Sequence, residues 1–285
     1  MRWTGRFCGG SALQDTGLPE RVRAQNKMRT LPVRGKKVFK PGTAARSFGT
    51  LLADFLYPRR CPVCGKILRR DEPLICGRCR TDLPWVREPF CIRCGKQISD
   101  PEKALCADCA KADHVFNEGR SALLYEKGVR QSVNRMKFYN HREYIPFYAA
   151  CLYVSLKQYL NIWKVRCIIP VPMHPKKKAE RGYDQAVLLA REFSCLCGLP
   201  VREDILERVR YTKASRKLGR QHRKANMRGA FRVRNDLKGE IPEPVLLLDD
   251  IYTTGTTMDN CARALRRAHV REIYFITLCT GRGAE

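Results

Sequence analysis

The stretch VLLLDDIYTTGTT, residues 245–257, decides the fold because it predicts a buried strand, then a tight turn, and then the start of a helix. Its four leading apolar residues are typical of a strand that is covered on both faces. After the turn, apolar residues recur with helical spacing at Met258, Cys261, Ala262 and Leu265. We therefore predict a helix that begins near Thr256 and a turn at the carboxyl edge of a sheet, where open α/β folds bind ligands.

The turn has the chemistry of an anion site. A helix that begins near Thr256 presents unpaired N–H groups and the positive end of its dipole, and both favour a phosphate. The candidate phosphate-binding residues are Thr253, Thr254, Gly255, Thr256 and Thr257. Asp249 and Asp250 would repel the same phosphate, so we expect them to face hydroxyl groups or a divalent cation. A sugar phosphate with Mg²⁺ suits both the phosphate-binding turn and the acid pair. The alternative is a capped core helix beside two solvated aspartates.

Beyond residue 117, short apolar runs alternate with amphipathic helices, which is typical of a parallel sheet covered on both faces. The runs that we predict as strands span residues 121–126, 167–172, 243–250 and 272–279. A helix is predicted over 186–197, because its apolar residues share one face and Gly198 follows. The fold class is therefore α/β. Since no Gly-Lys-Ser/Thr follows the acids, the turn is not the P-loop of a nucleotide triphosphatase.

Eight of the fifteen cysteines form a repeat with a period of 30 residues. Both copies read C-x2-C-x11-C-x2-C, and a glycine follows the second cysteine of each copy. The eight are Cys61, Cys64, Cys76, Cys79, Cys91, Cys94, Cys106 and Cys109. Two facing pairs of thiolates suit a tetrahedral Zn²⁺, so we predict two structural zinc sites rather than free or redox-active thiols. The four cysteines of each repeat could bind one ion, or the C-x-x-C pairs could alternate between the two sites so that each ion is bound by both repeats.

His114 follows the last of these cysteines and could replace one as a ligand, although we favour an ordinary surface histidine. Six further cysteines mostly fall in apolar patterns and are predicted to be small buried side chains. They are Cys151, Cys167, Cys195, Cys197, Cys261 and Cys279.

The formal charge of the chain is +27, from 55 Lys and Arg against 28 Asp and Glu, which favours polyanionic partners. The sequence holds neither a run of about 18 apolar residues nor the apolar core of a secretory signal. We therefore expect a cytoplasmic protein without membrane insertion. We divide the chain into a disordered basic leader (1–44), a module (45–115) with a helix over 48–56 and a double zinc ribbon, and an α/β domain (116–285).

A second polyanion site is indicated between residues 208 and 234, which contain eleven Lys and Arg and no acid. This density of positive charge exceeds what a single phosphate ligand requires and is typical of an electrostatic track for nucleic acid. Tyr211 and Phe231 could stack on bases, although two aromatic residues in such a span are ordinary.

Two acids after an apolar strand, followed by T-T-G-x-T, resemble the phosphoribosyl pyrophosphate (PRPP) motif of type I phosphoribosyltransferases. Three further blocks narrow the resemblance to the ComF family of competence-related proteins, over residues 48–280 or so. They are the C-x-x-C knuckles, IIPVPMHPKKKAERGYDQA (168–186) and TKASRKLGRQHRKANMRGAF (212–231). The resemblance implies that residues 116–285 form a type I phosphoribosyltransferase-like domain behind the double zinc ribbon.

The resemblance also implies roles for residues in these blocks. Asp249 and Asp250, as the catalytic pair, would contact the ribose hydroxyls, and the amides of residues 253–257 would hold the 5′-phosphate. The lid over the site would include Thr212, Arg223 and Asn226. The pyrophosphate loop would use Lys176, Lys177, Lys178 and Arg181, for which a solvated charged loop is the alternative.

Two positions depart from the family's pattern, because Ser215 stands where glutamine is usual and Asp184 where asparagine is usual. The resemblance implies an enzyme of nucleotide metabolism that transfers a pentosyl group from PRPP with Mg²⁺ and is linked to DNA uptake and natural competence. The alternative is a catalytically inactive competence factor that binds single-stranded DNA. The expected partners are PRPP, single-stranded DNA and the DNA-uptake machinery.

Overall fold

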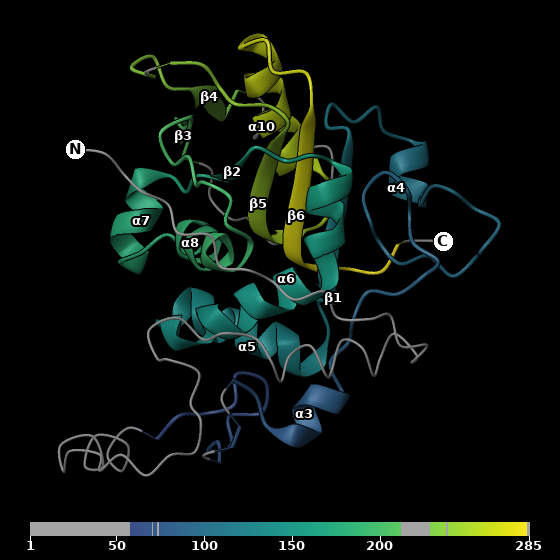
Figure 1. Cartoon of the computed structure of the whole chain (residues 1–285), viewed down its shortest axis with the longest axis vertical. Coiled ribbons are helices and arrows are strands. Elements are labelled where there is room, and N and C mark those ends of the chain that lie inside the picture. Colours follow the sequence, from purple (N-terminus) through teal and green to yellow (C-terminus); the bar gives the residue numbers. More distant parts are fainter. Residues whose placement is uncertain (1–57, 70, 73, 212–228, 238, 284–285) are drawn as a thin grey trace.

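The computed structural model describes residues 58–69, 71–72, 74–211, 229–237 and 239–283. Four parallel strands form its central sheet, in the order β1-β6-β5-β2 (Figure 1). They are β1 (Glu118–Leu124), β2 (Cys167–Pro170), β5 (Val245–Tyr252) and β6 (Ile273–Thr280). The four predicted strands and the parallel sheet are confirmed, with small shifts at the strand ends. The basic leader, the helix predicted over 48–56, Ser215 and the lid residues Thr212, Arg223 and Asn226 lie outside the described residues.

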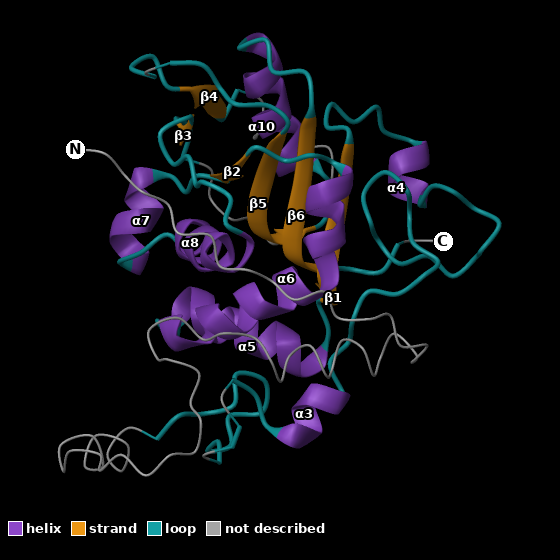
Figure 2. Cartoon of the chain, in the orientation of Figure 1, coloured by secondary structure: helices purple, strands orange, loops and turns teal. Residues whose placement is uncertain are grey.

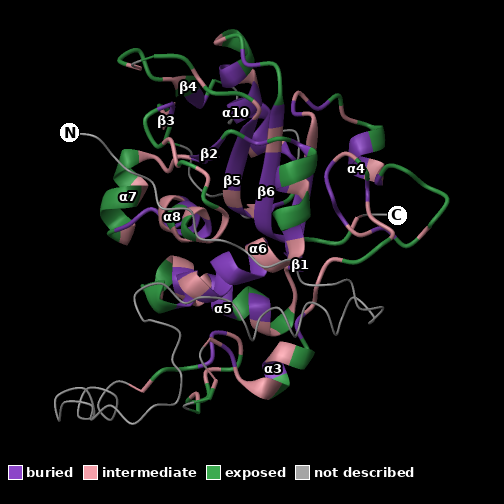
Figure 3. Ribbon diagram, viewed as in Figure 1, coloured by how far each residue is buried: buried purple, intermediate pink, exposed green. Residues whose placement is uncertain are grey.

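Helices cover both faces of the sheet (Figure 2). One face carries α5 (Lys127–Phe138), α6 (Ile145–Ile162) and α8 (Gln185–Cys197), and the other carries α10 (Thr256–Arg267). Successive side chains of β5 alternate between the two faces, since Leu246 packs with the first set and Leu247 with α10. Both sides of β5 are therefore buried (Figure 3), as its unbroken apolar run predicts.

Two of these helices confirm the sequence prediction. α8 ends at Cys197, where Gly198 adopts the left-handed conformation at φ +77° that closes a helix. α10 begins at Thr256 and buries the predicted apolar face. The sequence pattern does not predict α6, because buried residues occupy much of its circumference and leave only a weak polar face.

Shorter elements connect these layers. The turn η1 (Arg142–Tyr144) leads into α6, α7 (Pro175–Arg181) follows β2, and β3 (Leu206–Arg208) pairs antiparallel with β4 (Phe231–Val233). The cysteine repeats carry α3 (Gly77–Thr81) and α4 (Ala107–Ala110). Among the helices of the described ranges, none is both long and apolar enough to cross a membrane.

The two cysteine repeats pack on opposite sides of the sheet. Cys61 and Cys79 of the first repeat join the apolar cluster of α5, α6 and α8. All four cysteines of the second repeat join the cluster that contains α10. Gly95 of the second repeat lies so close to β1 that a Cβ atom there would stand 2.7 Å from the carbonyl oxygen of Gly119. One sequence unit therefore occupies two unlike positions in the fold.

Candidate functional site

The two predicted acids lie towards the carboxyl end of β5, whose neighbour on one side is β2. The chain leaves β5 through residues 253–255 and enters α10 on one face of the sheet. It leaves β2 through residues 171–174 and passes through α7 to α8 on the opposite face. Neighbouring parallel strands whose connections diverge in this way form a topological switch point, where ligands of open α/β folds bind.

Asp250 is held by side chains from two helices. Its Oδ1 accepts a hydrogen bond from Lys137 Nζ at 2.8 Å, and its Oδ2 accepts one from Gln185 Nε2 at 2.7 Å. Arg181 in turn donates to the Oε1 atom of Gln185, so a cation of the predicted pyrophosphate loop reaches this cluster. Asp250 is 5% exposed, and the opposite charge of Lys137 compensates its burial. The carboxylate is thus fixed in orientation, with lone pairs left over for a ligand.

Asp249 has a different environment. Its Oδ1 accepts a hydrogen bond from the N–H group of Asp250 at 2.8 Å, and the residue is half-buried. Burial and then the neighbouring Asp250 carboxylate raise the pKa of Asp249 to about 8. A bound cation or a hydroxyl donor would favour the ionised form. The pair therefore combines one carboxylate with a cationic partner and one whose charge depends on what binds.

The raised pKa of Asp249 predicts a pH-dependent stability. The folded chain keeps a proton that the unfolded chain releases between about pH 4 and pH 8, so this contribution is present at low pH and is lost as the pH rises through 8. In that window the free energy of unfolding of the wild type should fall, relative to Asp249→Asn, by up to about 1.4 kcal/mol per pH unit. Urea unfolding over a pH series measures both slopes. Asp236→Asn is the control because Asp236 is exposed and Arg234 lowers its pKa, and parallel curves for wild type and Asp249→Asn would contradict the prediction.

The turn at residues 253–255 leaves the first N–H groups of α10 without a side-chain cap. Gly255 is the residue before the helix, and its φ of +78° is one that L side chains rarely adopt. The hydroxyl groups of Thr254 and Thr256 lie 3.0 Å apart, and Thr253 is exposed. Uncapped N–H groups beside several hydroxyls can bind a tetrahedral anion.

Asp184 organises the connection between β2 and α8. Its carboxylate accepts hydrogen bonds from the N–H groups of Ala186 (3.0 Å) and Val187 (3.3 Å) in α8 and of Met173 (3.1 Å) in the loop after β2. The residue is 7% exposed, and burial raises the pKa of its carboxyl group. Asparagine has one acceptor oxygen, whereas the two oxygens of Asp184 serve the helix and the loop together. The aspartate that replaces the usual asparagine at position 184 therefore acts on the backbone of the loop after β2.

The four cations of the predicted pyrophosphate loop lie on α7. Lys176 and Lys178 are exposed, and Lys177 and Arg181 are half-buried. Burial lowers the pKa of Lys177, and the charges of Arg208 and Arg181 lower it further. Because repulsion among neighbouring cations is relieved by an anion between them, this helix can receive a polyanion beside the acids.

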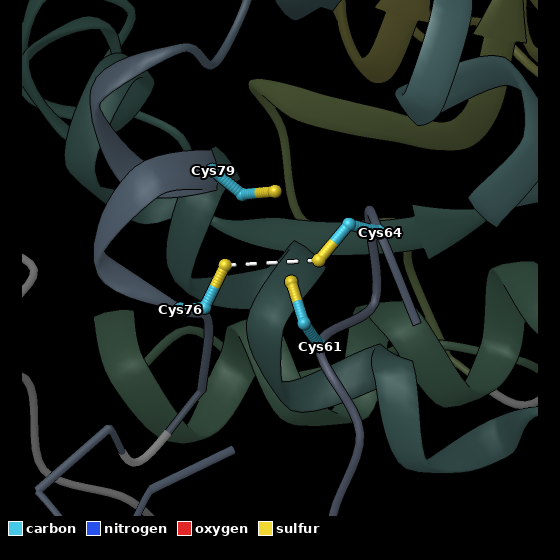
Figure 4. A group of neighbouring side chains, drawn as sticks. All are labelled: Cys61, Cys64, Cys76 and Cys79. Carbon is cyan, nitrogen blue, oxygen red and sulfur yellow. Dashed lines mark hydrogen bonds between the residues drawn. The ribbon is translucent and has the colours of Figure 1, made fainter. Parts of the chain in front are cut away.

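Each cysteine repeat brings its own four sulfur atoms together, within 4.8 Å of one another. Cys64 Sγ lies 3.7 Å from Cys76 Sγ in the first tetrad (Figure 4), and Cys94 Sγ lies 3.7 Å from Cys106 Sγ in the second. A tetrahedral Zn²⁺ about 2.3 Å from each sulfur spaces its ligands roughly 3.8 Å apart, so both tetrads fit the ion. The eight predicted cysteines thus support two structural zinc sites, and each repeat closes its own.

Both repeats form a knuckle at a glycine, and His114 lies outside both cysteine tetrads. The glycines after the second cysteines, Gly65 and Gly95, adopt φ values of +77° and +72°, as a tight knuckle requires. His114 belongs to neither tetrad, because it is 5% exposed and pairs with Asp259 at 2.9 Å. The surface histidine that we favoured from the sequence is therefore wrong.

Known proteins resemble the chain in its zinc module and over most of its length. A family model described as the double zinc ribbon domain matches residues 52–110. Competence protein F of Haemophilus influenzae is 28% identical over 218 residues, which cover 75% of this chain and 93% of that protein. The DNA utilization protein YhgH of Salmonella typhimurium is 24% identical over 225 residues, which cover 78% of this chain and 97% of that protein. The chain is therefore similar to competence proteins of the ComF type over most of its length.

Among solved structures, adenine phosphoribosyltransferase from Leishmania tarentolae is similar to this chain over 51% of the chain and 74% of that protein, at 13% sequence identity. The TM-score is 0.25, which is too low to compare the two sites.

Sequence reasoning missed two side chains that contact the candidate site. Gln185 directly follows the R-G-Y-D block, so the motif itself could have drawn attention to it. Lys137 closes α5, more than a hundred residues before Asp250, and no local pattern marks it. Arg208 lies near enough to Asp249 for the two charges to interact, although burial lowers the pKa of Arg208 overall. The roles of these residues towards a ligand stay predictions.

The two candidate zinc sites of the chain should lose zinc at different rates. Cys64 is exposed and Cys76 partly so, whereas all four cysteines of the second tetrad are buried. A chelator therefore reaches the first site directly but needs local opening of the core to reach the second, and we expect two release phases roughly tenfold or more apart. A chromophoric chelator measures the phases, and Cys64→Ser should lack the fast one. A single phase that releases both ions would contradict the prediction.

Proposed function

We propose that the chain binds PRPP with Mg²⁺ at the switch point between β2 and β5. Asp249 and Asp250 contact the ribose hydroxyls, residues 253–257 hold the 5′-phosphate, and the cations of α7 face the pyrophosphate. The observation that carries this proposal is the pairing of Asp250 with Lys137 and Gln185 beside an uncapped helix start. Carboxylates and N–H groups are thus prearranged for the two unlike halves of a sugar phosphate.

The proposed reaction is the transfer of the pentosyl group to an acceptor. The bond between the anomeric carbon and pyrophosphate breaks, the electron pair leaves with pyrophosphate, and the sugar carbon becomes cationic in the transition state. Asp249 and Asp250 would orient the ribose and offset this positive charge, and Lys177 and Arg181 would offset the charge on the leaving group. Carboxylate oxygens of the acid pair also suit Mg²⁺, which would neutralise phosphate oxygens when bound.

The relatives support a role in DNA uptake. One is named Competence protein F and another DNA utilization protein YhgH. The charge of +27 favours single-stranded DNA as a partner, alongside components of the uptake machinery. In the alternative version of the proposal, the chain binds PRPP or DNA without transferring the pentosyl group. We further propose that the zinc module (45–115) and the phosphoribosyltransferase-like domain (116–285) are its functional units.

Titration calorimetry with PRPP and Mg²⁺ tests the site. The double variant Asp249→Asn, Asp250→Asn should lose at least roughly 100-fold in affinity, because the two carboxyl groups that would hydrogen-bond to the ligand become amides. The matched control is Asp100→Asn, Asp236→Asn, which makes the same substitutions at side chains that are 42% and 70% exposed. Salt-sensitive binding of single-stranded DNA should persist in both variants. A wild type that does not bind PRPP would rule out the enzyme and leave nucleic acid as the main partner.

A further inference from the structure

A buried histidine–carboxylate pair joins the segment after the second cysteine repeat to the first turn of α10. His114 Nδ1 lies 2.9 Å from Asp259 Oδ2, and the N–H group of Val115 donates to Asp259 Oδ1 at 3.0 Å. The side chains of His114 and Asp259 are 1% and 9% exposed. Since an ionised carboxylate only accepts hydrogen bonds, the proton between them sits on Nδ1, and the pair fixes the orientation of the imidazole ring.

The same imidazole ring is packed against the turn that precedes α10. A Cβ atom on Gly255 would lie 2.7 Å from His114 Cε1 and 3.1 Å from His114 Nδ1, so the ring lies directly on this glycine. The N–H group of Asp259 also donates to the carbonyl oxygen of Gly255 at 2.8 Å. His114 therefore holds the turn in two ways, by contact with Gly255 and through Asp259.

His114 is itself held in place by the second cysteine repeat. Arg93, which stands between the knuckle residues Cys91 and Cys94, donates from Nη2 to the carbonyl oxygen of His114 at 2.7 Å. The Arg93 guanidinium also lies 5.8 Å from the ring centroid of Phe116, on which the His114 ring stacks with centroids 4.7 Å apart. Packed and hydrogen-bonded groups therefore run without interruption from the knuckle to the turn.

We propose that His114 is a positioning residue that anchors the loop 253–257 to the second zinc ribbon. The identity of the loop's ligand, a 5′-phosphate of PRPP, rests on the proposed function, but the anchor itself does not. By holding the loop before a ligand arrives, His114 reduces the ordering entropy that binding must overcome. The first ribbon contacts a different element, since Val63 lies against Gly128 of α5.

Hydrogen–deuterium exchange of the full chain without ligand tests the anchor. His114→Leu fills a similar volume but has no donor for Asp259, whereas His114→Asn keeps a donor near the position of Nδ1. We expect His114→Leu to accelerate exchange of the amides of residues 254–260 roughly tenfold, and His114→Asn to stay within about twofold of the wild type. His141→Leu is the control, because His141 pairs with Glu143 at 2.6 Å on the surface, and it should leave these amides unchanged. All variants should keep both zinc ions.

The outcomes separate the anchor from the proposed ligand. Wild-type exchange rates in His114→Leu would overturn the anchor, whether or not the chain binds PRPP. Equal acceleration in His114→Asn would overturn the hydrogen bond to Asp259 as the anchor, since the packing of the ring on Gly255 would then hold the loop. Calorimetry with PRPP and Mg²⁺ completes the test, and we expect roughly tenfold weaker binding in His114→Leu with recovery in His114→Asn. A loosened loop in His114→Leu, with a wild type that does not bind PRPP, would support the anchor and overturn the ligand.

Discussion

Replacing Gly255 by alanine is expected to destabilise the folded chain by about 2–5 kcal/mol and to weaken the proposed binding of PRPP at least roughly tenfold. The φ of +78° is unfavourable for any residue with a Cβ atom, and that atom would stand 2.7 Å from His114 Cε1 and 2.8 Å from Tyr252 Oη. Neither neighbour can move freely, because His114 is hydrogen-bonded to Asp259 and the Tyr252 ring stacks on Phe275 with centroids 4.8 Å apart. The loop must therefore shift, and its N–H groups shift with it.

Gly198→Ala separates strain in the backbone from this steric conflict. Gly198 has nearly the same φ, +77°, but a Cβ atom there would have no neighbour within 4 Å among the residues that the structure describes. Its substitution should cost only the backbone part, about 1 kcal/mol. Urea unfolding of both variants measures the difference, and equal losses of stability would show that the contact between His114 and Gly255 has no energetic weight.

Replacing Cys94 by serine is expected to prevent the chain from folding cooperatively, while Cys64→Ser leaves a folded protein with one zinc ion. Both cysteines hold the same place in their repeats, 30 residues apart. Cys94 is fully buried in the cluster that contains α10, whereas Cys64 is exposed. Binding of a structural zinc ion contributes roughly 10–16 kcal/mol, which matches or exceeds the 5–15 kcal/mol that stabilises a typical domain. Loss of the buried ion therefore destabilises the whole core, whereas the exposed side of the first tetrad can open locally while the core stays folded.

Zinc stoichiometry and denaturant unfolding of the two serine variants measure this difference. Cys64→Ser should unfold in one cooperative transition with one bound ion, since its tetrad stands at the edge of the core and the second site is intact. Cys94→Ser should show a broad, non-cooperative transition and exposed apolar surface. If both variants lose the same free energy of unfolding, the burial of the second tetrad does not determine its weight in the fold.

Local sequence patterns were sufficient for the strands, for α8 and α10, and for the two metal sites. The apolar run before Asp249 has the length and composition of a buried strand, and the cysteine spacings fit a tetrahedral ion without reference to the rest of the chain. The pairing of the cysteines needed the structure, because both arrangements satisfy the same spacing. Four of the six remaining cysteines are buried as predicted, but Cys195 is exposed and Cys197 is half-buried on α8.

The contacts that organise the site could not be read from local patterns. Lys137 and Asp250 are 113 residues apart, and His114 and Asp259 are 145 apart, so only the folded sheet brings them together. A single lysine at a helix end or a single histidine after a zinc knuckle is an ordinary feature of a sequence. Their importance comes from burial beside a partner, which depends on tertiary packing rather than on period or motif.

The unlike packing of the two repeats has a consequence for mutational tolerance. Gly65 and Gly95 hold equivalent places in their repeats and share a positive φ. Within the described part of the chain, a Cβ atom at position 65 would meet only an Arg135 nitrogen at 3.4 Å, whereas one at position 95 would lie 2.7 and 2.8 Å from the backbone of Gly119 and Arg120. An asparagine can tolerate the conformation but not the collision. Substitutions should therefore be tolerated more readily at position 65 than at position 95, where the backbone of β1 restricts the residue to glycine.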